Sequence, residues 1–406
     1  MAKILYAGDA FVQTGFGRVA EYLLPALAKE HEVHVLATNW HGDYDEEAVK
    51  YKSYPAMAHG SDPFGSHRIA ELVQTIQPDL VWVTNDLWVA INLWEAVKPL
   101  KEGLGFKFFV YTPIDSYGIF PELNDPVSEW DGLATYTEFG KQELIKMGYD
   151  KPIHIIPHGT DFTKFFPMDP LETRRELGVP EDTFIVFNGN RNQPRKRIDL
   201  TIKGFIEFAK DKPDARLWLN MGAKDMGWEI VPLFKRVARD SGYDATGKLI
   251  LTSPHFSTHN CLSIEQLNKV YNAVDIGLNT CIGEGWGLVN SEHAATGTAQ
   301  VVPDHTSLKE IFDGIPRIAC NGSETDRNYG LERLPPDPSS VAAILNDYYE
   351  DRSALEKAGQ WCHDRIHEKQ FTWPVITKKM LRIVNEVLSK QDQESFKGFG
   401  SPVKIG

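Results

Sequence analysis

The chain has 406 residues, 42% hydrophobic and 24% charged, which is the composition of a globular protein, and at roughly 150 residues per domain it predicts two or three domains. Its formal net charge is −13, and residues 1–163 hold 12 Lys and Arg against 23 Asp and Glu, so that −11 falls in the first part and −2 in the rest. Nucleic acids and anionic membranes require basic clustering, so this balance argues against both as partners of the first part.

The first 163 residues predict strands that alternate with helices. Continuous apolar segments such as 79–84 (DLVWVT) and 107–112 (KFFVYT) are typical of parallel strands covered on both faces. The predicted strands are 3–7, 32–38, 79–84, 107–112, 132–136 and 153–156, and the predicted helices are 17–29, 68–76 and 140–147.

The alternation is interrupted at 157–170, where prolines, aromatic residues and polar residues are typical of a connection between domains, and it then resumes. The later predicted strands are 184–188, 216–221, 248–252, 275–279 and 300–302, and the later helices are 199–210, 230–240, 264–273 and 288–296. We therefore predict an α/β fold with two consecutive Rossmann-like domains that face an inter-domain cleft. The expected limits are 1–163 and 164–375, followed by a terminal helix at 376–392 and a loosely ordered tail at 393–406.

Other features predict the cellular setting. The four cysteines have no C-x-x-C spacing, which is typical of free thiols in a reducing compartment. No segment reaches the roughly 20 apolar residues of a membrane helix. The opening residues, MAKILYAGDAF, predict a strand and not a signal peptide. We therefore expect a cytoplasmic protein without a transmembrane segment, and its oligomeric state is not indicated.

Loops that lead from a strand into a helix are the first candidates for a site, because open α/β sheets bind ligands beyond the carboxyl ends of their strands. Gly15, Phe16 and Gly17 open the helix after the first predicted strand, and small residues there let backbone N–H groups approach an anion. The segment matches neither G-x-G-x-x-G, because Ala20 replaces the third glycine, nor the Walker loop. A tight turn explains the same residues.

A second candidate is the loop 188–197 (NGNRNQPRKR), which follows the first strand of the second domain and holds four cations in seven residues. Arg191 and Lys196 flank a proline-containing turn, so both could reach over the end of the strand. A guanidinium with an ammonium group is suited to holding a diphosphate. A solvated basic loop is the alternative.

The third candidate is 283–292 (GEGWGLVNSE). Gly285 and Gly287 allow a sharp turn with exposed N–H groups, and a helix starting near Leu288 would direct the positive end of its dipole into the loop. Glu284 precedes this helix and Glu292 lies inside it, and two carboxylates there can accept hydrogen bonds from vicinal hydroxyls. The alternative is that Glu284 favours the helix dipole and Glu292 is a surface acid.

Two weaker signals remain. His255 and His259 have H-x-x-x-H spacing near Cys261, but they lie in a loop rich in Ser, Thr and Pro, so we predict no metal site. Asp115 follows the strand 107–112 and either faces the cleft or is a turn aspartate.

Together these motifs resemble the retaining glycosyltransferases of the GT-B fold, specifically glycosyltransferase family 4, over nearly the whole chain. Glu284 to Glu292 is similar to the E-x7-E signature of that family, and Arg191 with Lys196 to its phosphate-binding pair. The segment from Thr14 to Gly17 resembles its glycine-rich loop, and 156–167 (IPHGTDFTKFFP) resembles its inter-domain sequence, IPNGVDxxxFxP.

The resemblance implies a GT-B protein in which 1–163 is the acceptor-side domain, 164–375 the donor domain, and the terminal helix crosses back to the first. It implies that Arg191 and Lys196 hold the diphosphate leaving group and that Glu292 holds the ribose. The remaining implied donor-binding residues are Glu284, Gly285, Trp286, Gly287 and Leu288 around the transferred sugar, and Gly15, Phe16 and Gly17 closing over the phosphates.

The implied donor is a UDP- or GDP-sugar, with no other cofactor and no metal, because cations and helix dipoles stabilise the leaving group. The implied reaction is a retaining transfer by front-face attack to a glycan, a small molecule or a lipid-linked acceptor. One departure concerns the histidine that many members carry in a T-x-H-D-like sequence, because Ile114 stands in its place. Asp115 is therefore assigned, with Glu284, Arg191 and Lys196, to the implied catalytic residues. The alternative is a branch with a different sugar or acceptor geometry.

Two other functions stay open. One is a nucleotide-sugar-binding protein without transferase activity, against which the complete set of Arg191, Lys196, Glu284 and Glu292 argues. The other is a glycosyltransferase that acts on modified DNA, against which the −11 charge of residues 1–163 argues.

Overall fold

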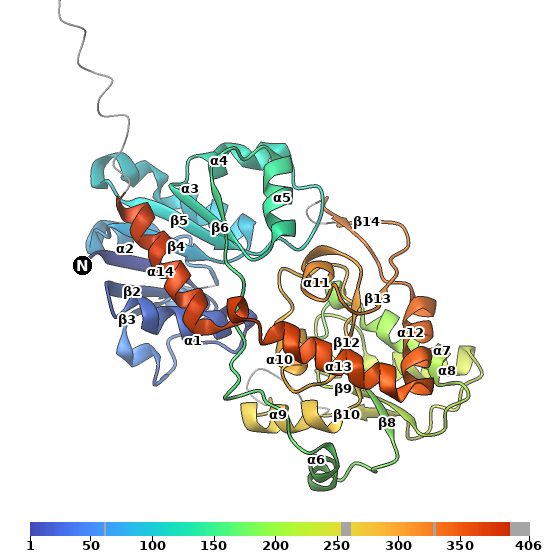
Figure 1. Cartoon of the computed structure of the whole chain (residues 1–406). Coiled ribbons are helices and arrows are strands. Elements are labelled where there is room, and N and C mark those ends of the chain that lie inside the picture. The colour runs from blue at the N-terminus through green and yellow to red at the C-terminus, as the bar shows by residue number, and fades with distance from the viewer. Residues whose placement is uncertain (61, 253–260, 328–329, 390–406) are drawn as a thin grey trace, which may run out of the picture.

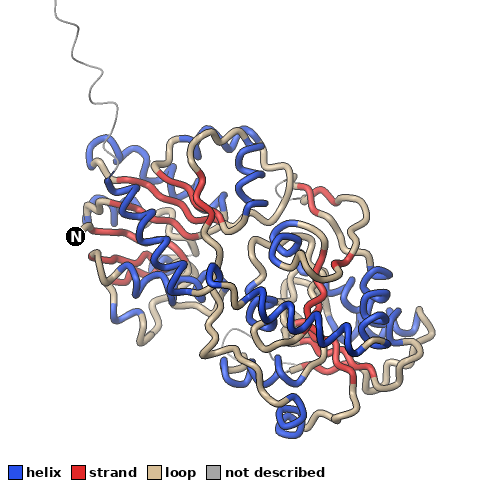
Figure 2. Tube along the Cα trace, in the orientation of Figure 1, coloured by secondary structure: helices blue, strands red, loops and turns tan. Residues whose placement is uncertain are grey.

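The computed structural model describes residues 1–60, 62–252, 261–327 and 330–389 (Figure 1). The predicted H-x-x-x-H histidines, the tail at 393–406 and residues 390–392 of the predicted terminal helix lie outside the described residues. Figure 2 shows two separate groups of strands, each accompanied by helices. The predicted α/β fold with two Rossmann-like parallel sheets is confirmed.

The first sheet has seven strands, all parallel, in the order β3-β2-β1-β4-β5-β6-β7. Its strands are β1 (Lys3–Gly8), β2 (Glu32–Ala37), β3 (Lys52–Pro55), β4 (Leu80–Thr84), β5 (Lys107–Thr112), β6 (Gly132–Thr135) and β7 (Ile153–Ile155). The helices between them are α1 (Gly15–Leu27), α2 (Ile69–Ile76), α3 (Leu87–Leu104), α4 (Asn124–Ser128) and α5 (Glu138–Met147). All five residues of β4 are buried, as expected for a central parallel strand.

The second sheet has six parallel strands in the order β10-β9-β8-β11-β12-β13. Its strands are β8 (Phe184–Asn188), β9 (Ala215–Leu219), β10 (Leu249–Leu251), β11 (Ile276–Leu278), β12 (Ala299–Pro303) and β13 (Arg317–Ile318). Its helices are α6 (Pro170–Leu177), α7 (Ile198–Ala209), α8 (Ile230–Asp240), α9 (Ile264–Ala273), α10 (Leu288–Ala294), α11 (Thr306–Ile311), α12 (Pro338–Glu350) and α13 (Arg352–Ile366).

Both sheets reverse their strand order in the middle, between β1 and β4 in the first and between β8 and β11 in the second. The connections on either side of such a reversal leave in opposite directions and open a crevice at the carboxyl ends of the strands. The three candidate loops of the sequence follow β1, β8 and β11, so each lies at one of these two positions.

The last described helix, α14 (Trp373–Ser389), leaves the second sheet and contacts α1 and β5 of the first (Figure 1). Its buried positions include Ile376, Met380, Val384 and Val387, and their spacing forms one apolar stripe. At its start, the Trp373 ring stacks on Tyr22 of α1 with centroids 4.4 Å apart. The predicted return of the terminal helix to the first half is thereby confirmed, whereas the predicted domain limits stay predictions.

A second crossing is made by the cross-domain segment, which we define as the described residues of 319–337. It contains β14 (Glu324–Thr325) and β15 (Glu332–Arg333). The N–H of Tyr117 donates to the carbonyl of Glu332 at 3.0 Å, and the N–H of Glu332 donates back to Tyr117 at 3.0 Å. Leu331 packs against the apolar cluster of the first sheet. The two halves are therefore also joined by this segment and by α14, besides the linker.

His158 lies in an aromatic cluster where these crossings meet. Its ring lies 4.0 Å from Tyr136, 5.6 Å from Trp286 and 6.3 Å from Trp373, measured between centroids. The Tyr111 hydroxyl lies 2.9 Å from Nδ1 of His158. The side chain is buried, and this burial lowers the pKa of His158 to about 3.

We predict that replacing His158 with Asn makes stability less sensitive to acid. An unfolded histidine binds a proton near pH 6.5, whereas His158 in the native state stays neutral until about pH 3, so its contribution is lost as pH falls from 6.5. Between pH 7 and pH 5 the free energy of unfolding of the wild type should therefore fall by about 2 kcal/mol more than that of His158→Asn. Urea unfolding at both pH values measures this difference, and equal losses in the two proteins would contradict it.

Candidate functional site

Glu284 is the centre of an ion network at the carboxyl ends of β8 and β11. A 3-10 turn, η4 (Pro194–Lys196), directs two consecutive cations toward it. The Lys196 ammonium donates to Oε1 of Glu284, and Nη1 of Arg195 lies 3.3 Å from Oε2. Nη1 of Arg195 also donates to the carbonyl of Gly283. Lys196 and Glu284, which come from two separate candidate loops of the sequence, therefore lie in direct contact.

The charge state of Glu284 follows from these contacts. Burial would raise the pKa of Glu284, but Lys196 and Arg195 outweigh it and lower the pKa to about 2. The carboxylate is thus ionised at neutral pH although only 6% of the residue is exposed. A buried carboxylate between two cations is suited to accepting hydrogen bonds from hydroxyl groups.

The network continues into the first half of the chain through Asp115, which follows β5. Nε of Arg195 lies 3.4 Å from Oδ2 of Asp115, and Nη1 of Arg333, on β15, lies 3.3 Å from Oδ1. Lys196, Glu284, Arg195, Asp115 and Arg333 therefore form a chain of alternating charges. Asp115 lies beside the other candidate residues, and of its two interpretations the structure favours the one that faces the second half.

The glycines before α10 serve two different purposes. Gly287 has φ of +94°, a left-handed conformation that favours glycine, and it caps the start of α10. Gly285 is needed for proximity, because a Cβ there would lie 2.5 Å from Cβ of Pro113. Gly283 is closer still, since its Cβ would lie 1.8 Å from the carbonyl oxygen of Asp115. The chain bends at Gly285, as the sequence predicts, and the close contact with Pro113 is a second reason for glycine there.

The second carboxylate, Glu292, lies on α10 and pairs with Arg18 of α1, with Oε1 2.5 Å from Nη1. Burial raises the pKa of Glu292 to about 7, and Arg18 opposes this shift. Glu292 is 7% exposed, so the alternative of a surface acid is wrong.

The glycine-rich loop after β1 faces the start of α10. A Cβ on Gly15 would lie 3.5 Å from the Leu288 side chain. The N–H of Gly17 donates to Oγ1 of Thr14 at 3.0 Å, which caps α1, and a Cβ on Gly17 would lie 2.1 Å from the carbonyl of Val12. Phe16 is partly buried against the core. Gly17 therefore serves the tight turn that the sequence offered as an alternative, and its approach to phosphate stays a prediction.

Arg191 does not join the network. Its side chain is 53% exposed and pairs with Asp225, with Nε 2.8 Å from Oδ2. The loop is held in this arrangement by Asn192, whose Nδ2 donates to the carbonyls of Gly222 and Trp228 at 3.1 and 2.7 Å. Arg195 contacts Glu284 instead. The phosphate-binding role of Arg191 stays a prediction, and it would require Arg191 to leave Asp225.

Four residues that the sequence did not single out lie at this site, namely Arg18, Asp86, Arg195 and Arg333. Asp86 follows β4, at the reversal of the first sheet, and could have been found by the same loop argument as Asp115. Asp86 is exposed, and partial removal of its carboxyl group from bulk water together with the charge of Asp115 raises its pKa to about 6.

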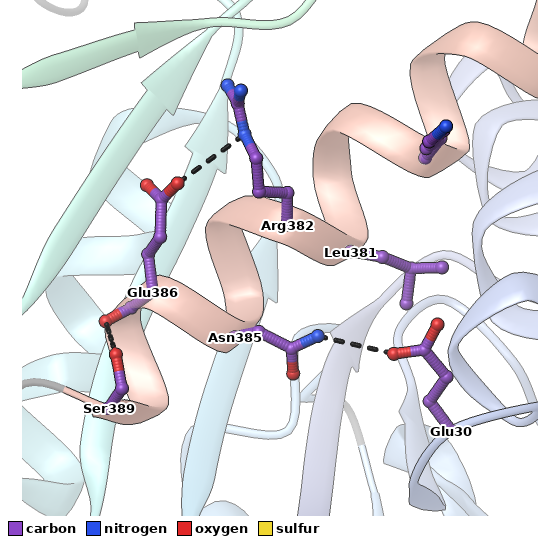
Figure 3. A pocket seen from close by; sticks show the side chains of 7 residues that line it. Glu30, Leu381, Arg382, Asn385, Glu386 and Ser389 are labelled. Atoms are coloured by element: carbon purple, nitrogen blue, oxygen red, sulfur yellow. Dashed lines mark hydrogen bonds and ion pairs between the residues drawn. The ribbon is translucent and has the colours of Figure 1, made fainter.

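A cavity of about 500 Å³ lies elsewhere, between α14 and Glu30 at the end of α1 (Figure 3). Four of its polar side chains form pairs: Nδ2 of Asn385 lies 3.2 Å from Oε2 of Glu30, and Nε of Arg382 lies 3.4 Å from Glu386. This cavity is not part of the candidate site.

Among the described residues, no group of three or more His, Cys, Asp and Glu could hold a metal ion. No helix in the same part of the chain is long and apolar enough to cross a membrane.

The chain is similar to known proteins in both sequence and structure. Residues 14–164 match the model of Glycosyltransferase Family 4. The D-inositol 3-phosphate glycosyltransferase of Corynebacterium kroppenstedtii is 28% identical over 273 residues, which are 65% of this chain and 55% of that protein. The chain spans about half the length of the curated relatives it matches, at 55%, 50% and 54% of the first three.

Solved structures share the fold at lower identity. Sucrose-phosphate synthase from Thermosynechococcus elongatus has a TM-score of 0.74 at 14% identity, over 96% of this chain and 100% of that one. Anabaena Alr3699/HepE in complex with UDP-glucose has a TM-score of 0.68 at 15% identity, over 95% of this chain and 100% of that one. Residues 14–164 therefore form a domain similar to Glycosyltransferase Family 4, and the whole chain shares the GT-B fold of these solved structures.

Proposed function

We propose that the protein is a retaining glycosyltransferase that takes a sugar from a nucleotide-diphosphate donor, with UDP-sugars the first class to test. The observation that carries the proposal is the network of Lys196, Glu284 and Arg195 at the reversal point of the second sheet. UDP is favoured over GDP because one structural neighbour was solved with UDP-glucose and another with UDP-2-fluoro glucose. The acceptor is a hydroxyl group of a glycan, a small molecule or a lipid-linked molecule.

Each residue has a role that its charge and position support. Lys196 and Arg195 hold the diphosphate, and Arg191 joins them if it leaves Asp225. Glu284 accepts hydrogen bonds from hydroxyls of the transferred sugar, assisted by N–H groups at the start of α10. Glu292 accepts hydrogen bonds from the ribose, and Gly15 and Gly17 approach the phosphates from the first half.

The reaction requires one bond exchange at the anomeric carbon. The bond from this carbon to the phosphate oxygen breaks, and a bond to the acceptor oxygen forms on the same face. The acceptor proton passes to the departing phosphate oxygen. Lys196 and Arg195 stabilise the negative charge that develops on that oxygen, which is the kind of electrostatic stabilisation that contributes most in many enzymes.

The proposal is tested first by donor binding. A thermal-shift panel of UDP-, GDP- and ADP-sugars should give at least one donor that raises the melting temperature. Replacing Glu292 with Gln should then lower the affinity for this donor by roughly 10- to 100-fold, because a hydrogen bond to a charged group contributes about 1.5–3 kcal/mol. Isothermal titration calorimetry measures both dissociation constants.

The matched control is Glu265→Gln on α9, whose side chain is 84% exposed and should leave donor affinity unchanged. The proposal fails if no nucleotide sugar binds or turns over. Donor binding without turnover on any acceptor would indicate a nucleotide-sugar-binding protein. Salt-sensitive affinity for DNA would indicate a DNA acceptor.

A further inference from the structure

Arg18 and Glu292 are 274 positions apart in sequence and meet between the two halves of the molecule. Arg18 is in the first turn of α1, and Glu292 is in the middle of α10. Their side chains are 22% and 9% exposed, so the pair is largely shielded from solvent. An ion pair in such surroundings is screened much less than one on the surface.

Other charged or titratable groups near Glu292 do not replace Arg18. Lys164, in the connection after β7, lies 2.5 Å from Glu21 of α1, so its charge is already balanced. Tyr271 of α9 is buried, which raises its pKa well above the usual value and keeps it neutral. Glu21 carries a like charge and opposes ionisation of Glu292. Among the described residues, Arg18 is the cation in direct contact with Glu292.

The contact also orients the carboxylate. The Arg18 guanidinium lies 5.7 Å from the centroid of the Phe165 ring, which gives it a second partner besides Glu292. Its Nη1 binds Oε1 of Glu292, and no described residue donates a hydrogen bond to Oε2. One carboxylate oxygen is thus paired with Arg18, and the other keeps its capacity to accept hydrogen bonds.

We propose that Arg18 is a positioning residue for the donor, which holds Glu292 ionised and oriented so that Oε2 accepts hydrogen bonds from the ribose hydroxyls. The inference rests on the proposed role of Glu292 as the ribose ligand. Because Arg18 belongs to the first half and Glu292 to the second, donor recognition by one half depends on a side chain of the other.

The direction of the expected pH dependence of donor binding follows from the pKa of Glu292, which burial raises and Arg18 lowers. Its pKa is already about 7 with Arg18 in place, since burial disfavours the charged form. Removing a neighbouring opposite charge raises a carboxyl pKa by about one to three units. Without Arg18, Glu292 is therefore mostly protonated at pH 7 and becomes ionised only at higher pH.

The test is donor affinity as a function of pH from 6 to 9. The probe is UDP-glucose, GDP-mannose or ADP-glucose, whichever raises the melting temperature most, because the diphosphate of a nucleotide sugar does not titrate in this range. Wild-type binding should tighten as pH rises through about 7. In Arg18→Gln the pH at the midpoint of this affinity curve should rise by about one to three units. Donor binding by this variant should be weaker than that of the wild type by roughly fivefold or more at pH 7, and should recover at higher pH.

Controls separate this role from a structural one. Arg18→Lys keeps the charge and should keep the midpoint close to that of the wild type. Arg382→Gln on α14, a 68% exposed arginine, should behave as the wild type. In Glu292→Gln the pH dependence should disappear, and adding Arg18→Gln should then cause little further loss. If Arg18→Gln does not fold, proton release on donor binding to the wild type at pH 7, measured in buffers of different ionisation enthalpy, tests the same point.

The outcomes are distinguishable. The proposed role of Arg18 is overturned if the midpoint of donor affinity against pH is the same in Arg18→Gln as in the wild type. It is also overturned if the wild type releases no proton when it binds the donor at pH 7. If Glu292→Gln weakens donor binding at the same time, the proposed function stands. If Glu292→Gln binds the donor like the wild type, the proposed ribose role fails and the inference on Arg18 fails with it.

Discussion

Replacing Lys196 with Met should lower kcat by on the order of 100- to 1000-fold, which is the loss seen when one preorganised donor to a developing anion is removed. Lys196 is 9% exposed, and its ammonium group lies against Glu284 at the end of β8. Without it, the diphosphate loses a cation and Glu284 loses one of its two charged partners. A transfer assay at saturating donor measures the effect.

The matched control for this change is Lys203→Met on α7. Its side chain is 48% exposed and lies 3.9 Å from Asp199, so its removal should change neither kcat nor KM. Breaking a buried pair costs about 3–5 kcal/mol of stability, so the melting temperature of Lys196→Met should be lower. A folded Lys196→Met variant with wild-type kcat would contradict the assignment.

Replacing Arg195 with Gln should reduce kcat/KM on the order of 100-fold, and replacing Arg191 with Gln by less than about tenfold. Arg195 contacts both Glu284 and Asp115, so its loss leaves two carboxylates without the guanidinium they share. Arg191 is half-exposed and pairs with Asp225, and exposed pairs of this kind contribute about 0–1 kcal/mol.

Comparing these two variants shows whether Arg195 or Arg191 is the arginine of this loop that binds the diphosphate. Both remove one guanidinium, so a difference between them cannot come from the change in net charge. The measurement is kcat/KM for the donor at fixed acceptor. The reverse order, with Arg191→Gln the more severe, would show that Arg191 leaves Asp225 and binds the diphosphate as the sequence motif predicts.

The sequence predicts the fold well where apolar strands are continuous. β4 is buried along its whole length and β5 from Phe108 onward, so their apolar composition alone marks them as strands. The helix α3 was missed because its apolar residues are not confined to one face and Pro99 lies inside it. The edge strand β3 was missed because its residues, KSYP, are polar or end in proline. For α12, Asp337 and Pro338 are a helix start that was available in the sequence.

The sequence singled out the carboxylates Glu284, Glu292 and Asp115 and the cation Lys196, but it did not single out Asp86, Arg18, Arg195 or Arg333. Glu284 and Glu292 are fixed by their places around one glycine turn, which is local information. The choice between Arg191 and Arg195 depends on Asn192, which is anchored to a loop some 30 residues later, beyond the reach of local spacing. Arg333 reaches Asp115 across 218 positions, through a segment without apolar periodicity. Such contacts are set by tertiary structure alone.

The central claim, a retaining transfer from a nucleotide sugar, is tested most directly by the stereochemistry of the product. Proton NMR of the anomeric signal should be followed from the first turnovers, with an α-configured donor chosen from the binding panel. An α-linked product is expected when an acceptor is present. A β-linked product, or neither binding nor turnover with any UDP-, GDP- or ADP-sugar, would contradict it.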